Sequence, residues 1–217
     1  MNKDTVNQIL NRDYIMENVY IRMLHQSQHH SAKYPILNLD AELRIHVRIS
    51  DSVIGTLQVN DLLCNIANIS SDDLWKAAIH NFLKDVCIQS ITDFLGFSLP
   101  NNEYNLYVVR TPKFMNGAAA LCIPEVFQNF CKHHHEQSCF ILPSSTEDLI
   151  VLPYSVKVHL NLDNLAKLVN EINCEVVNPH LRLDPVSYYY DLSTNSICIS
   201  ETLDNRYICY IWKRLTV

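Results

Sequence analysis

Glycine is scarce in this sequence: only Gly55, Gly96 and Gly117 occur among 217 residues, well below the usual share of about 7%. Loops that hold phosphate groups need glycine, because their backbone amides approach the ligand closely and adopt positive φ values. Three isolated glycines form neither a GxGxxG nor a GxxxxGK[ST] motif, and no GxSxG elbow is present. We therefore exclude dinucleotide oxidoreductases, P-loop NTPases and α/β-hydrolases.

Long apolar runs and an export signal are also missing. The apolar stretches, such as residues 149–152, fall well short of the about 20 residues that cross a bilayer. The N-terminal Met-Asn-Lys-Asp begins a mixed polar stretch without the apolar core of a signal peptide. We therefore expect a cytoplasmic protein with no membrane partner.

The eight cysteines include no CxxC pair. In a chain without an export signal, reduced thiols are the default. Several cysteines lie in apolar runs, as in Leu121-Cys122-Ile123, where a thiol packs as a small hydrophobe. We expect free, mostly buried thiols and no disulfides.

The composition is that of a globular protein, with 48% hydrophobic and 18% charged residues. The net charge is −6, so binding would gain little from neutralising phosphate groups. Nucleic acids and anionic membranes are therefore disfavoured as partners. The oligomeric state is left open.

Helix and strand patterns alternate along the chain and predict an α+β fold, with a mixed, largely antiparallel sheet and packed helices. Spacing predicts helices over residues 4–28, from 70 to about 96, from Pro124 onward and over 162–172. Strands are predicted over 43–49, 53–59, 104–110, 118–122, 139–142 and 149–152, with a hairpin over 186–199 and an apolar element over 207–212. The turn-rich residues 99–102 suggest two lobes, a helix-strand-strand-helix lobe over 1–99 and an α/β lobe over 100–217.

Four motifs carry a resemblance to a known family. They are Asn116-Gly117-Ala118-Ala119, Ile141-Leu142-Pro143-Ser144-Ser145, Val169-Asn170-Glu171-Ile172-Asn173 and the stretch over residues 184–191. In this order they resemble a domain family of unknown function found in anaerobic Firmicutes, over about residues 104–200. Relatives have a His-Glu pair where this chain has Glu147-Asp148. The resemblance implies a shared fold and little chemistry.

The loop that follows the Ile-Leu-Pro motif is a candidate binding site, with Ser144, Ser145, Glu147 and Asp148 between two apolar strands. Its hydroxyls could bind a polar ligand, and one carboxylate could act as a general base. The alternative is a capped turn, because serine and aspartate side chains bond to local backbone amides.

Cys131, His133, His135 and Cys139 form a candidate zinc site, because thiolate and imidazole are the preferred zinc ligands. Cys131 and His135 would share one helix face at spacing i, i+4. The alternative is a solvated helix end, where histidines interact favourably with the helix dipole. No other cofactor is expected.

Two further groups could contact a partner. Arg44, His46 and Arg48 share one strand face, which could meet phosphates or an acidic partner or be the wet face of a sheet. In the triplet 188–190, alternate rings pack inward, and Tyr189 must therefore point to the opposite face and needs a cover.

Two classes of function remain. The missing catalytic motifs and the aromatic-rich C-terminal segment favour a non-enzymatic binding protein that recognises another macromolecule, with a protein as the expected partner. The alternative is a hydrolase that uses a metal ion or a carboxylate, based on the Cys/His cluster and on Glu147-Asp148. We expect the serine loop, the histidines and the basic strand to lie apart.

Overall fold

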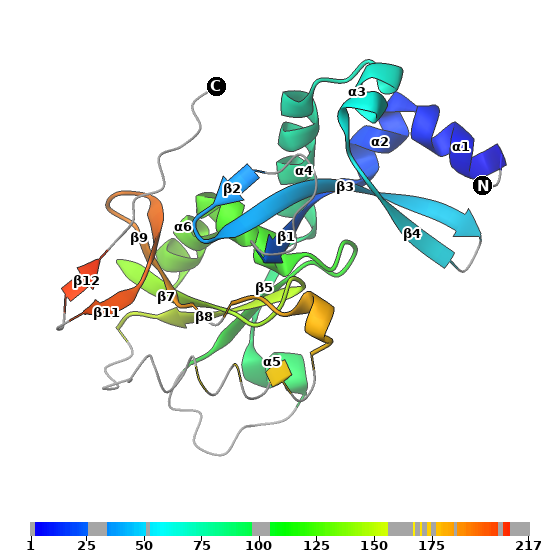
Figure 1. Ribbon diagram of the computed structural model, residues 1–217. Helices are drawn as coiled ribbons and strands as arrows, with labels where there is room; N and C mark the ends of the chain where they lie inside the picture. The colour runs from blue at the N-terminus through cyan, green and yellow to red at the C-terminus, as the bar shows by residue number, and fades with distance from the viewer. Residues whose placement is uncertain are drawn as a thin grey trace.

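A computed structural model describes residues 3–25, 34–50, 53–96, 105–155, 167, 170, 173–174, 177–184, 186–203 and 206–208. The chain has an α+β fold with antiparallel sheets (Figure 1), as the sequence predicts. The described helices are α1 Lys3–Leu10, α2 Arg12–Asn18, α3 Asp61–Ala67, α4 Ser71–Asp85, α5 Ile91–Leu95 and α6 Pro124–His133, with 3-10 helices η1 Gly117–Cys122 and η2 Pro179–Leu181.

The first sheet is built around one long strand, β3 Leu39–Ser50. Strand β1 Val19–His25 pairs with one edge of β3, and β2 Tyr34–Ile36 and β4 Val53–Gln58 pair with the other. Beyond residue 45, where the pairing with β1 ends, β3 and β4 continue as a two-stranded arm that extends away from the second sheet (Figure 1). The predicted strands over 43–49 and 53–59 are therefore confirmed.

The second sheet has six strands in the order β10-β9-β7-β8-β6-β5, all antiparallel. The predicted strands and the predicted hairpin of this half are present, apart from residues 118–122. The strands are β5 Cys87–Ser90, β6 Tyr107–Arg110, β7 Ser138–Pro143, β8 Asp148–Pro153, β9 Tyr188–Asp191 and β10 Ser196–Ile199, and β11 Glu201–Leu203 pairs separately with β12 Arg206–Ile208.

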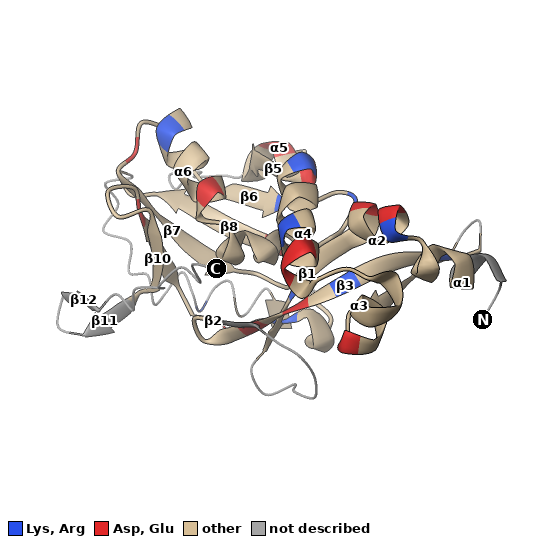
Figure 2. Cartoon of the chain, turned by 90° about the horizontal axis from the view of Figure 1, so that it is seen from above, with Lys and Arg blue, Asp and Glu red and all other residues tan. Residues whose placement is uncertain are grey.

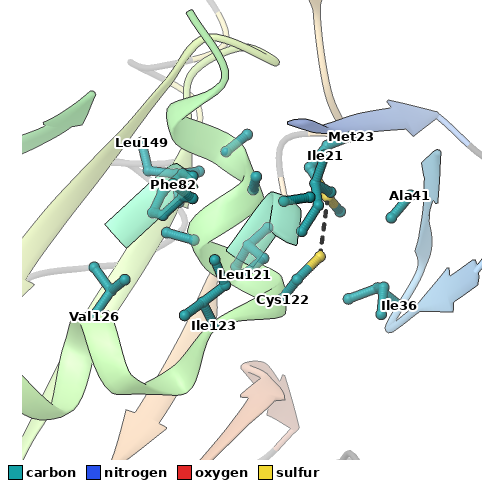
Figure 3. Close-up of a cluster of buried hydrophobic side chains, with 14 of the residues drawn as sticks. Ile21, Met23, Ile36, Ala41, Phe82, Leu121, Cys122, Ile123, Val126 and Leu149 are labelled. Carbon is teal, nitrogen blue, oxygen red and sulfur yellow. Dashed lines mark hydrogen bonds between the residues drawn. The ribbon is translucent and has the colours of Figure 1, made fainter. Parts of the chain in front are cut away.

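One hydrophobic core joins the two sheets. Its buried side chains come from β1, β3 and α4 on one side and from η1, α6 and the strands of the second sheet on the other. Figure 3 shows Ile21 and Met23 facing Leu121 and Cys122, with the thiol of Cys122 3.5 Å from the sulfur of Met23. The first sheet is thereby packed onto the second through the small residues of η1.

The predicted helix over residues 4–28 is wrong beyond Asn18, because the chain continues as β1. Most residues of β1 are buried, on both of its faces, so its apolar run has no alternation to distinguish a strand from a helix. The change of structure is fixed by Asn81 of α4, whose buried Nδ2 donates to Met16 O and Val19 O, both at 2.9 Å. A tertiary hydrogen bond thus ends α2 and begins β1.

Three other predictions need correction or lie outside the described residues. Residues 118–122 form the 3-10 helix η1 instead of a strand, since a buried run of small residues fits either. Helix α4 ends at Asp85, and Gly96, at φ 72°, caps the separate helix α5. The predicted lobe boundary at 99–102 and most of the predicted helix 162–172 lie outside the described residues.

Candidate functional site

The serine loop between β7 and β8 is held by hydrogen bonds to its own backbone and to other segments of the chain. Ser145 Oγ accepts from the amides of Glu147 and Asp148 at 3.0 and 3.3 Å. Ser144 Oγ donates to the buried Asn173 side chain at 3.0 Å, and Thr146 N donates to Leu181 O at 2.8 Å. These bonds occupy both hydroxyls in the way a capped turn requires.

The two carboxylates that follow are partly exposed and lie beside arginines. Burial, followed by the charge of Asp148, raises the pKa of Glu147, and Arg22 of β1 opposes the shift. Burial also raises the pKa of Asp148, and Arg110, its partner across β6 and β8, opposes it. Glu147 is therefore the residue of this loop that is electrostatically linked to the first sheet.

The basic strand does not present three equivalent cations. The Arg44 guanidinium is paired with the buried carboxylate of Glu42 and donates to Thr56 Oγ1 at 3.0 Å. The ring of His46 packs against Tyr20, with centroids 4.5 Å apart, and burial lowers its pKa. Arg48 is exposed on the two-stranded arm.

The residues of the candidate zinc site point in different directions. Cys131 and Cys139 are buried and share a hydrogen bond, and burial raises the pKa of Cys139. His133 is exposed at the last position of α6, and His135 is exposed beyond the helix, in the left-handed region at φ 58°. Among the described residues, no group of three or more His, Cys, Asp or Glu side chains is arranged to hold a metal ion.

Tyr189 lies on the opposite face of β9 from the fully buried Tyr188 and Tyr190. Its ring packs against Phe140 and Tyr154, with centroids 5.5 and 6.1 Å apart. These neighbours give the ring cover from the same chain. Both the serine loop and the basic strand lie near β1: the charge of Arg22 in β1 acts on Glu147 of the loop, and β1 pairs with β3, which carries the basic residues. The histidines and Tyr189 belong to the second sheet and its helices.

The free edge of β4 is a candidate site that the sequence analysis missed. Val59 N donates to Leu43 O at 2.9 Å, so the pairs 43/59, 45/57 and 47/55 are the hydrogen-bonded pairs of the β3–β4 ladder. The N–H and C=O groups of Ile54 and Thr56 must then point away from β3. Within the described residues, no strand pairs with this edge.

The opposite edge of the arm is blocked. Where β1 ends, the side chain of Gln8 takes the place of a neighbouring strand: its Oε1 accepts from Arg48 N at 2.8 Å and its Nε2 donates to Arg48 O at 3.4 Å. Edge strands are commonly protected by charges or proline, but β4, with the sequence VIGTLQ, contains neither. This uncharged run was the signal in the sequence that could have revealed the edge.

Large apolar side chains are exposed along the same arm. Ile54 is 66% exposed and lies on the face shared with Arg48, and Ile49 and Val53 are each about half exposed. Ile49 lies across Gly55, where an added Cβ would be only 2.6 Å from Ile49 Cδ1. Figure 2 shows acidic and basic residues interspersed on the neighbouring α2 and α4. The arm therefore exposes large apolar side chains, whereas the helices beside it carry charged ones.

The chain belongs to a family of unknown function, DUF5688, whose model matches residues 1–192. The match includes the first hundred residues, which the motif resemblance did not cover. No curated protein and no solved structure matches the chain. None of the described helices has the length and apolar character needed to span a membrane.

Proposed function

We propose that this protein is a non-enzymatic binding protein that recognises an extended segment of another protein by adding it as a strand beside β4. The observation that carries the proposal is the outward direction of the main-chain groups of Ile54 and Thr56 on an uncharged edge. Strand addition gains affinity from main-chain hydrogen bonds and specificity from alternate side chains. Here Ile54, on the face it shares with Arg48, would contact an apolar side chain of the partner.

The length of β4 favours a peptide segment over a second copy of the chain. Six residues of strand span about 20 Å, and an edge of this size buries much less than the about 1,200–2,000 Å² of a stable protein–protein interface. A short extended segment needs only the hydrogen bonds of one strand and a few side-chain contacts. The proposed partner is therefore an extended segment of a cytoplasmic protein.

A proline substitution at residue 54 tests the proposal by removing one of the main-chain N–H donors that the partner would use. Ile54→Pro removes an N–H that points away from β3, so the β3–β4 ladder remains intact. Ile54→Thr keeps the N–H and a β-branched side chain and is the matched control. Peptides of twelve residues are selected from a random display library on the wild-type protein. The affinity of each selected peptide is then measured for both variants.

We expect the selected peptides to bind Ile54→Pro at least about tenfold more weakly than Ile54→Thr, because a main-chain bond is lost and its partner left unpaired. Bound peptide should also slow amide exchange at Thr56. Equal binding by the two variants would contradict the proposal, as would failure to select any peptide. A concentration-dependent dimer seen by light scattering would identify a second copy as the occupant instead.

The serine loop supports a second candidate, a hydrolase that uses Glu147 as a general acid or base. The raised pKa of Glu147, which is caused first by burial, favours this role. Hydrolysis of ester, amide or phosphate test substrates, lost in Glu147→Gln but retained in Glu125→Gln on the exposed surface of α6, would support it. We further infer that the four motifs that resemble the Firmicutes family maintain the fold. Three residues of these motifs, Gly117, Ser144 and Asn173, form hydrogen bonds to other segments of the chain.

A further inference from the structure

A groove of about 580 Å³ lies between the β5–α5 segment and the end of α6, on the second sheet and away from the β4 edge. We propose that it binds an organic cation, a primary ammonium or guanidinium group on a short aliphatic chain. This inference does not depend on the proposed function. Three features of the groove support it: an aromatic wall, a carboxylate among the lining residues, and the partial negative charge at the C-terminal end of α6.

The aromatic wall consists of Tyr107, Phe130 and His134. Tyr107 meets Phe130 edge-on with centroids 5.1 Å apart, and His134 lies 4.6 Å from Tyr107 and 4.4 Å from Phe130. Tyr107 Oη is also 3.4 Å from His134 Nδ1. Because the rings brace one another, the wall is formed before a ligand arrives, and aromatic faces attract cations.

The charge of the groove is complementary to a cation. The described residues that line it include one carboxylate, Asp93, and neither lysine nor arginine. Asp93 is exposed in the first turn of α5 and is oriented by Ser90 Oγ, which donates to it at 2.6 Å. Burial, followed by the charge of His133, lowers the pKa of His134, which disfavours the cationic form of its ring.

The end of α6 adds to this polarity. The helix ends at His133, beside the groove, and the C-terminal end of a helix carries partial negative charge that stabilises cations within about one turn. The exposed amide of Asn129 lies on the same wall and can orient the chain of the ligand. An ammonium or guanidinium group between Asp93 and the rings would pair with the carboxylate, contact the aromatic rings and be stabilised by the helix end.

Calorimetric titration tests the inference with four probes: spermidine, N-acetyl-lysine methylamide, the neutral 1,6-hexanediol and the anionic adipate. We expect saturable binding of one or both cations and none of the diol or adipate. Binding of both cations indicates a site for the side chain of a protein, whereas binding of spermidine alone indicates a free polyamine. No binding of either cation, or equal binding of the diol or adipate, would overturn the proposal.

Two variants separate the groove from general attraction to an acidic protein. Asp93→Asn should weaken cation binding about fivefold or more, because it removes the carboxylate and keeps the side-chain shape. Asp72→Asn makes the same charge change on the exposed first turn of α4 and should leave binding unchanged. Equal weakening by both variants would show only non-specific attraction and would refute the site.

Discussion

Gly117 N donates to Glu147 O at 2.6 Å, which joins the start of η1 to the serine loop beside the end of β6. The approach is so close that a Cβ built at Gly117 would lie 2.5 Å from the same oxygen and nearer still to Val109 O. Both neighbours are backbone atoms, Val109 O in β6 and Glu147 O in the hydrogen-bonded serine loop, so neither can move aside as a flexible side chain would. Residue 117 must therefore be glycine, because the backbone around it leaves no space for a side chain.

We predict that Gly117→Ala destabilises the fold by about 3 kcal/mol, because overpacking against backbone must shift η1 or β6. Gly96→Ala is the control: there a Cβ has open space and only the φ of 72° is unfavourable, so the cost should be about 1 kcal/mol. Urea unfolding measures both values. A smaller effect at residue 117 than at residue 96 would contradict the close approach.

Gln8 should control the exposure of one edge of the arm. Gln8→Ala removes both side-chain bonds to the backbone of Arg48, so we predict amide exchange at Arg48 about tenfold faster with little change in global stability. Hydrogen exchange followed by NMR measures the rate. Exchange at Ile45, which pairs with both neighbouring strands, is the internal control and should not change.

His46 should make stability depend on pH. Burial, with a further contribution from Lys113, lowers its pKa in the folded state, so the unfolded chain binds the proton more readily between that value and about 6.5. Stability therefore rises with pH through this window and falls on acidification. Comparing unfolding at about pH 5 and about pH 7.5, we expect His46→Gln to show a smaller difference than wild type, and the exposed His80→Gln to match wild type.

Thiol reactivity should follow burial. Cys174 is exposed, whereas Cys122 is fully buried and burial raises its pKa to about 12. We predict that iodoacetamide modifies Cys174 in the native protein and leaves Cys122, Cys131, Cys139 and Cys198 unmodified until urea is added. Peptide mass spectrometry identifies the modified positions. Modification of Cys122 at the rate of Cys174 would show that the core around η1 opens readily.

The sequence predicts the elements whose patterns are local. Helix α4 follows from its Ser70 cap and its apolar spacing, and the β9–β10 hairpin from a turn between two short apolar runs. Strand β1 and η1 could not be predicted, because both are buried almost completely and periodicity then carries no information. What decides them is a distant contact, such as that of Asn81 with Val19.

The candidate sites show the same limit. The side-chain types of the serine loop predict a capped turn as one alternative, and Ser145 does accept from local amides, yet nothing local indicates that Ser144 bonds to Asn173 or that the charge of Arg22 acts on Glu147. The β4 edge and the aromatic groove depend on which surfaces the fold leaves uncovered. Such surfaces exist only after the strands are paired.

The pairing of β5 with β6 joins the two halves of the chain, because residues 87–90 belong to the sheet formed by residues after 104. A gene divided after residue 99 would therefore yield two fragments that each lack part of a common sheet. Neither should fold alone, but together they should reassemble through β5. This chain could thus serve as a split reporter whose signal depends on bringing both pieces into the same compartment.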